Sequence, residues 1–134
     1  MNMKLTFKQS ITAGVLAAAV AALINAILFF LFQSMGVITD DIMVQPDQPM
    51  TILPIVMSSV LPILIGACVF FLFEKYGKNG YKTFRIVAII LLILSFGNPF
   101  IGIPNVTIAY AMALIVMHVV VAGSLLYFIK RAKD

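Results

Sequence analysis

His118 is the single histidine of this 134-residue chain, and it lies near the middle of a long apolar run close to the C-terminus. A neutral imidazole can relay a proton, hydrogen-bond a ligand or coordinate a metal ion. An ionisable residue within a segment long enough to cross a membrane is a functional candidate by default. The competing interpretation is structural, with an uncharged histidine that donates to a neighbouring helix. The sequence leaves both interpretations open.

Asn25 lies in the middle of the first apolar run and is the natural partner of His118. It lies ten residues from the end of its run and His118 twelve residues from the matching end of its own, which correspond to about 15 Å and about 18 Å along a helix. This similar depth allows the two side chains to meet, because the first and last helices of an up-down bundle are neighbours. The alternative is that Asn25 only holds helices together through hydrogen bonds.

Further polar side chains gather toward the same end of the apolar runs. They are Ser58, Ser59, Asn98, Asn105, Thr107 and Tyr110. Together with an interruption of the third run, they predict a polar pocket that opens at that side of the membrane. Their alternative role is to satisfy backbone groups freed by Pro62, Pro99 and Pro104. The candidate binding residues are therefore His118, Asn25, Ser58, Ser59, Asn98 and Tyr110.

Residue types that carry catalysis or hold metals are scarce. The single cysteine, Cys68, excludes a disulfide within the chain, a CxxC redox pair and a cysteine zinc site. The single histidine excludes a bis-histidine haem within one chain. We recognise no nucleophile–base pair, phosphate-binding loop or metal-ligand cluster. We therefore expect no catalytic residue, no cofactor and no metal site.

The elements that position these residues are membrane spans. Apolar residues make up 63% of the chain and charged residues 10%, whereas soluble domains average about 45–50% and about 25%. The predicted spans cover about 11–35, 52–73, 83–96 with an irregular extension to 105, and 106–129. A helix rises about 1.5 Å per residue and must cross about 30 Å of hydrocarbon. We predict one integral membrane domain over residues 1–134, an all-α, up-down bundle of four transmembrane helices.

Two segments interrupt this helical pattern. The third span meets two glycines and two prolines between Gly97 and Pro104, which predicts that its helix ends within about two residues of Phe96 and that 97–105 is non-helical. The loop at 36–50 has two interpretations, a short β-hairpin or an ordered loop without strands. In the hairpin, Pro46 and Asp47 would take the central positions of a type I turn.

The first span carries two series of small residues at a spacing of four. They are Gly14, Ala18, Ala22 and Ala26, and next to them Ala13, Ala17, Ala21 and Asn25. Small residues at this spacing let helix backbones approach closely, which favours packing where lipid removes the hydrophobic driving force. We expect this span to make a close helix–helix interface.

The basic residues predict the orientation. All nine precede span one, surround the connection between spans two and three, or follow span four, whereas Asp40, Asp41 and Asp47 lie in the first loop on the opposite side. The positive-inside rule then places both termini in the cytoplasm. The net charge of +4 thus reports topology, and we expect no nucleic-acid partner.

Several short stretches match a known arrangement. An Ala-rich first helix with LINA at 23–26 is followed by a Pro-bearing loop, then by VLPILIGA at 60–67, and finally by MHVVVA at 117–122. In this arrangement the chain resembles, over nearly its whole length, a family of small four-helix bacterial membrane proteins of unknown function. The resemblance implies a bacterial cytoplasmic (inner) membrane protein and supplies no activity. It also implies that Asn25, Pro62 and His118 correspond to recurring polar and proline features of the family.

The expected function is non-enzymatic binding or interaction. An outward-facing pocket within the membrane would hold a small apolar or lipid-like ligand. Two other functions fit the sequence, a small transporter or proton-coupled carrier that uses His118, and a scaffold or accessory subunit of a membrane complex. The expected partners are membrane lipids, a small apolar ligand and a second copy of the chain.

Overall fold

The computed structural model describes residues 4–134, and most of these residues are helical. In chain order the elements are α1 (Phe7–Ser34), β1 (Met43–Gln45), β2 (Gln48–Pro49), α2 (Ile52–Tyr76), α3 (Gly80–Ser95), α4 (Asn98–Gly102) and α5 (Ile108–Lys133). Four segments are long and apolar enough to cross a membrane, namely α1, α2, α5 and α3 together with α4. The predicted four-span, all-α fold is confirmed.

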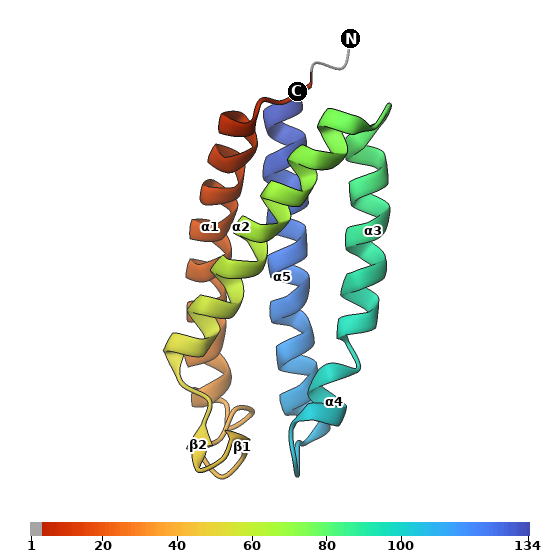
Figure 1. Ribbon diagram of the computed structural model, residues 1–134. Coiled ribbons are helices and arrows are strands. Elements are labelled where there is room, and N and C mark those ends of the chain that lie inside the picture. Colours follow the sequence, from red (N-terminus) through yellow and green to blue (C-terminus); the bar gives the residue numbers. More distant parts are fainter. Residues whose placement is uncertain (1–3) are drawn as a thin grey trace.

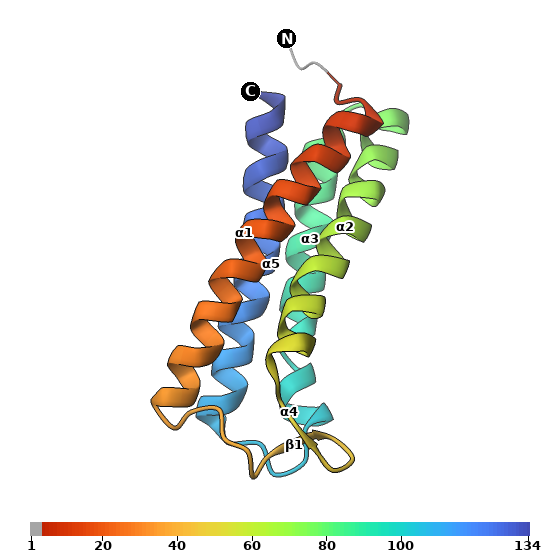
Figure 2. The same ribbon diagram turned by 90° about the vertical axis from the view of Figure 1, so that its left-hand side faces the viewer.

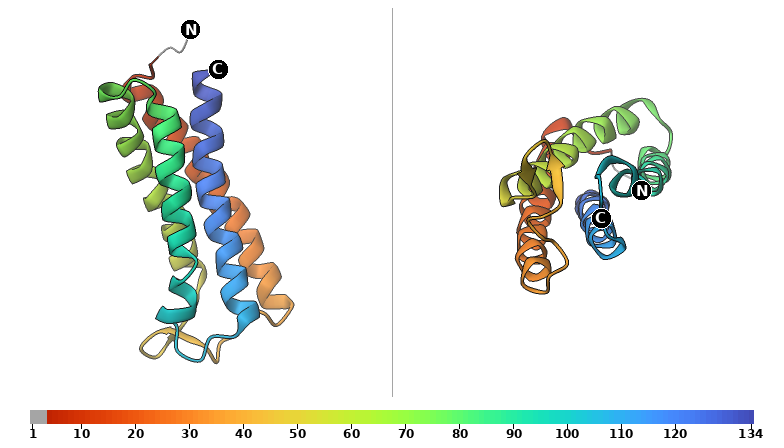
Figure 3. Two further views of the ribbon diagram at one scale, coloured as in Figure 1. Left: turned by 90° about the vertical axis from the view of Figure 1, so that its right-hand side faces the viewer. Right: turned by 90° about the horizontal axis from the view of Figure 1, so that it is seen from below.

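The four long segments run up and down, so that the start of α1 and the end of α5 lie at one end of the bundle (Figure 1). We call this the terminal end, and the opposite end, which carries β1 and β2, the hairpin end. Helix α1 lies across α2 and α5 (Figure 2). Viewed along the bundle, α1 and α3 lie on opposite sides of α5, with α2 running along both (Figure 3).

Helix α1 packs closely on α2 through the small residues that the sequence singles out. Its buried positions include Ala13, Gly14, Ala17, Ala18 and Ala21. A Cβ atom added at Gly14 would lie 2.7 Å from the Cβ of Ala67 in α2. The two backbones are therefore as close as glycine and alanine allow, which is the geometry expected of small residues spaced four apart in a membrane.

A buried carboxylate ties the elements together at the terminal end. Glu74, near the end of α2, is 3% exposed and accepts a hydrogen bond from the backbone N–H of Leu5 at 3.1 Å. It also pairs with the ammonium group of Lys133 in the last turn of α5. A Cβ atom on Gly80 would lie 2.6 Å from the Cα of Glu74, so only glycine lets α3 begin so close to α2. The start of α1 and the ends of α2 and α5 are thus held at one point.

The interruption after α3 is shorter than the sequence predicts. Helix α3 ends at Ser95, next to the expected Phe96, but the prediction of a non-helical stretch over 97–105 is wrong, because Asn98–Gly102 forms α4. Pro99 occupies the first turn of α4, where a backbone N–H has no partner within the helix, so the proline that cannot continue α3 is compatible with the start of α4.

The hairpin interpretation of the first loop is confirmed. Strands β1 and β2 pair antiparallel, with Met43 opposite Pro49 and Gln45 opposite Gln48. The predicted turn type is wrong, because Asp47 has φ of +59°, whereas the third residue of a type I turn has φ near −90°. Aspartate tolerates a positive φ better than most side chains, and a glycine is therefore not needed at this position.

Candidate functional site

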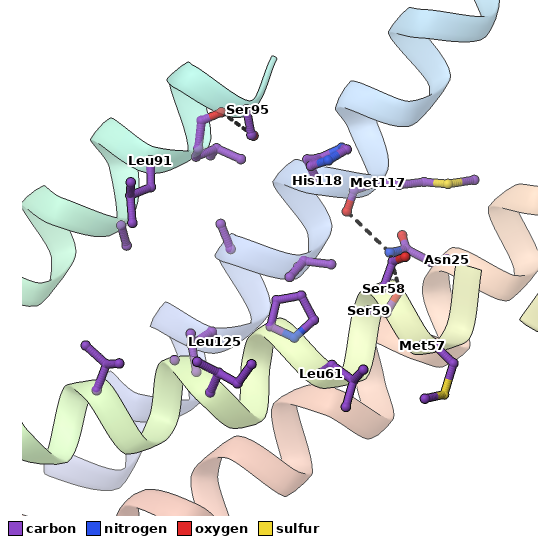
Figure 4. Close-up of a pocket in the computed structure, with 18 of the residues that line it drawn as sticks. Asn25, Met57, Ser58, Ser59, Leu61, Leu91, Ser95, Met117, His118 and Leu125 are labelled. Atoms are coloured by element: carbon purple, nitrogen blue, oxygen red, sulfur yellow. Dashed lines mark hydrogen bonds between the residues drawn. The ribbon is translucent and has the colours of Figure 1, made fainter. Parts of the chain in front are cut away.

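A cavity of about 760 Å³ lies between α2, α3 and α5. Figure 4 shows it as the space between Leu91 and Ser95 on α3 and the side chains of α2 and α5. Most of its wall is apolar, and Leu125 and Phe84 line the part nearer the terminal end. Its polar lining residues lie toward the hairpin end, and they are Asn25, Ser58, Ser59, Ser95 and His118.

The cavity exists because α3 is attached to the bundle near one end. The buried residues of α3 are Gly80 and Phe84, both in its first turns. The Phe84 ring packs edge to face against Phe70 and Phe73, at centroid distances of 5.3 and 6.1 Å. Nearby, the Tyr81 hydroxyl donates to a backbone carbonyl of α5 at 3.4 Å. Beyond these contacts α3 forms one wall of the cavity.

A second cavity of about 500 Å³ lies at the hairpin end, between the hairpin, α2, α4 and α5. Its polar lining residues are Gln45, Gln48, Thr51, Ser58, Asn98 and His118. Ile55, Ser58 and His118 line both cavities. The mainly apolar cavity and the more polar one therefore meet at these three side chains, which we call the junction.

Asn25 joins three helices at the edge of the larger cavity. Its Nδ2 donates to Ser59 Oγ at 2.9 Å and to the Met117 carbonyl at 3.3 Å (Figure 4). The Ser59 hydroxyl in turn donates to the Ile55 carbonyl at 2.8 Å. A carbonyl can only accept, so these partners fix which side of the amide carries the nitrogen. The Oδ1 atom is buried and accepts no hydrogen bond from the described residues.

The hydrogen bond expected between Asn25 and His118 is not formed among residues 4–134. The amide of Asn25 bonds to the backbone of Met117, one residue before His118. The imidazole Nδ1 of His118 instead lies 2.6 Å from the Leu114 carbonyl of its own helix. Both residues line the larger cavity, but each side chain forms its hydrogen bonds with other residues.

The hydrogen bond of His118 assigns roles to its ring nitrogens. The Leu114 carbonyl accepts, so Nδ1 must carry the proton that it donates. In the neutral ring this leaves Nε2 as an acceptor. Within residues 4–134, no hydrogen bond to Nε2 is found. An acceptor without a protein partner therefore belongs to a side chain that lines both cavities.

The other predicted site residues divide into two groups. Ser58 lies at the junction and Asn98 lines the smaller cavity. Tyr110 lines neither cavity, because it is fully buried in the cluster around Phe29 and Leu114 at the hairpin end. Its hydroxyl is left without a partner among the described residues. The structure thus brings five of the six predicted residues to the two cavities and leaves out Tyr110.

Sequence reasoning missed Ser95, Gln45, Gln48 and Thr51, which also line the cavities. Their signal is weak but present, since Ser95 directly precedes the break after α3 and the two glutamines flank the hairpin turn. The lining of both cavities contains no lysine, arginine, aspartate or glutamate. Among the described residues no group of three or more histidine, cysteine or acidic side chains could hold a metal ion.

Comparison with protein families shows the family to which the chain belongs. Searches of curated proteins and of solved structures find no match to this chain. The model of a family described as "Family of unknown function (DUF6069)" matches residues 6–134. Because this match covers nearly the whole chain, the protein belongs to this family of unknown function, as a membrane protein with four apolar helices.

Proposed function

We propose that the protein binds a small apolar or lipid-like molecule in the cavity between α2, α3 and α5 and does not convert it chemically. The observation that carries this proposal is the cavity itself, about 760 Å³ in volume and apolar except toward the hairpin end. Sites for small molecules typically measure about 300–1,000 Å³ and are apolar with a few well-placed polar groups. Both features are present.

The orientation in the membrane follows from charge and belongs to the same proposal. All nine lysines and arginines lie near the terminal end, and Asp40, Asp41 and Asp47 lie at the hairpin end. Basic residues favour the cytoplasmic side. The protein would therefore lie in the bacterial cytoplasmic membrane with both termini in the cytoplasm and with the smaller cavity facing outward.

A carrier that uses His118 is the second candidate, because this residue lies where the two cavities meet. Binding is favoured over passage by the packing at the terminal end, where Phe70 and Ile129 are fully buried in one cluster with Phe84 and Leu125. Uptake of a substrate into proteoliposomes, driven by a proton gradient and lost in His118→Leu, would favour the carrier.

The experiment that tests binding fills the cavity. Ala88 of α3 lines the larger cavity, so Ala88→Phe should occupy part of it, whereas Ala19→Phe adds the same ring to an exposed position of α1. Native mass spectrometry from mild detergent measures how much oleyl alcohol each protein retains. We expect about tenfold less retention for Ala88→Phe, equivalent to about 1.4 kcal/mol, and no change for Ala19→Phe. Equal retention of oleyl alcohol by the unmodified protein and both variants would refute the proposal.

A further inference from the structure

We infer that the ligand is a single-chain amphiphile whose polar end is an uncharged hydrogen-bond donor, such as a hydroxyl group, placed at the junction of the two cavities. This inference rests on the proposed function and names the chemical class of the ligand. It combines the shape of the site, the hydrogen-bonding capacity of the junction and the charge of the lining.

The shape of the site suits a molecule with two unlike ends. From the junction, the larger cavity extends between apolar side chains as far as Phe84 and Leu125, toward the terminal end. The smaller cavity extends toward the hairpin end and carries amide and hydroxyl side chains. A hydrocarbon chain would lie in the first and a polar end would lie at, or just beyond, the junction. Apolar surface is then buried by apolar surface, and polar groups keep polar partners.

The junction offers an acceptor that needs a donor. In the neutral imidazole, Nε2 of His118 is an acceptor, because the Nδ1–H group donates to the Leu114 carbonyl. The hydroxyl of Ser58 forms no hydrogen bond with any residue in 4–134, so it is available either to donate or to accept. A ligand hydroxyl at this point can donate to Nε2 and accept from Ser58. An ester or a hydrocarbon would displace water and leave Nε2 unpaired, which carries a cost in free energy.

The lining argues against a charged end. Neither cavity is lined by a lysine or an arginine that would compensate an anion. The acidic residues Asp40, Asp41 and Asp47 lie at the hairpin end and repel one. A cationic end is also disfavoured in the site, because no carboxylate that would compensate its charge lines either cavity. Burying an unpaired charge costs far more than burying a neutral polar group, so a neutral donor fits the junction best.

The test compares three probes with the same 18-carbon chain and different polar ends. Oleyl alcohol has a neutral donor, methyl oleate has no donor, and oleate at pH 8 carries a negative charge. Native mass spectrometry measures retention of each probe by the full chain, purified in an amine-oxide detergent that has no hydroxyl group of its own. We expect the alcohol to be retained about tenfold more strongly than either of the others, a difference in binding free energy of about 1.4 kcal/mol.

Variants at the junction test whether His118 causes the preference for the alcohol over the other two probes. His118→Leu removes the acceptor, so the preference for the alcohol should fall to less than about twofold, equivalent to about 0.4 kcal/mol. His118→Gln restores an acceptor in the form of an amide oxygen and should recover much of the preference. Ser34→Ala is the control, because the Ser34 hydroxyl donates to Leu31 of its own helix and lines neither cavity.

The outcomes separate this inference from the proposed function. Equal retention of the three probes would refute the requirement for a donor and leave apolar binding intact. Preference for oleate would refute the argument from charge. Retention of none of the probes would overturn the proposed function and this inference with it. The ranking of the probes on the unmodified protein decides the matter even if His118→Leu does not fold.

Discussion

Helices α1 and α3 pack against the same two partners, α2 and α5, and they do so very differently. Eight residues of α1 are buried, and all but Asn25 and Phe29 are serine, alanine or glycine. Two residues of α3 are buried, Gly80 and Phe84, both near the terminal end. Helix α1 lies in close backbone contact with α2, whereas α3 forms one wall of an open cavity.

The difference follows from the sizes of the side chains. Between Ile86 and Leu94, α3 is built almost entirely of isoleucine, leucine and valine, with Ala88 as the single small residue. Large branched side chains keep helix axes apart, whereas small residues spaced four apart allow close approach. In a membrane the outer side of α3 meets lipid at no cost, so nothing forces this helix onto the bundle. The cavity therefore forms beside α3 because this helix lacks the series of small residues that α1 carries.

A larger side chain in the close interface between α1 and α2 should have the largest effect on the free energy of unfolding. In Gly14→Val the added Cβ alone would lie 2.7 Å from Ala67 Cβ, so α1 and α2 must separate. We expect a loss of about 3 kcal/mol in the free energy of unfolding, the upper part of the range for overpacked cores. Unfolding in mixed detergent micelles, followed by circular dichroism, measures it.

The matched control is Gly123→Val on α5. A Cβ atom at Gly123 meets nothing within 4 Å, so its effect should stay within about 0.5 kcal/mol. If both glycine variants lost the same free energy of unfolding, close backbone contact would not distinguish α1 from α3.

The second prediction concerns the point where α3 is attached. Phe84→Ala removes the ring that packs against Phe70 and Phe73. We expect a loss of about 2 kcal/mol, less than the usual cost in a water-soluble core, because lipid replaces part of the lost apolar contact. Amide hydrogen exchange should become faster in α3 and stay unchanged in α1.

Leu94→Ala serves as the comparison for Phe84→Ala. Leu94 lies on the same helix and is 70% exposed, so its truncation should change the free energy of unfolding by no more than about 0.5 kcal/mol. Faster exchange in α1 as well as α3 after Phe84→Ala would contradict a separately attached α3.

The sequence predicts the fold well, because the physics of membrane spans is local. The length and polarity of each run define the helices, and the spacing of small residues in the first span predicts the close face of α1. The fate of the segment after Phe96 was harder to predict, because the same proline that ends one helix can begin another.

The site was predicted less completely, for a geometrical reason. The position of a residue along the sequence gives its depth in the membrane, but its direction around the helix axis depends on how the helices pack. Asn25 and Met117 therefore meet where Asn25 and His118 were expected to. The role of Glu74 is similarly non-local, because Lys133 lies 59 residues away in the chain. No local pattern indicates that these two side chains come together.

The third prediction has the smallest expected effect and tests the hydrogen bond between α1 and α2 at the edge of the larger cavity. Asn25 Nδ2 donates to Ser59 Oγ across α1 and α2. We expect Asn25→Leu and Ser59→Ala each to lower the free energy of unfolding by about 1 kcal/mol. The double variant should lose about 0.6 kcal/mol less than the sum, which is the average coupling of hydrogen bonds between membrane helices.

The control for this coupling is the pair that does not bond. Asn25→Leu combined with His118→Leu should be closer to additive, since the amide contacts the Met117 carbonyl and the imidazole contacts Leu114. The same unfolding measurement on all of these variants gives both couplings. A larger coupling for Asn25 with His118 than with Ser59 would mean that the imidazole turns toward the amide in the membrane. Because Oδ1 of Asn25 accepts no bond from the described residues, such a turn would give it a donor and take His118 away from the junction, so this result would also count against a ligand hydroxyl bound to Nε2.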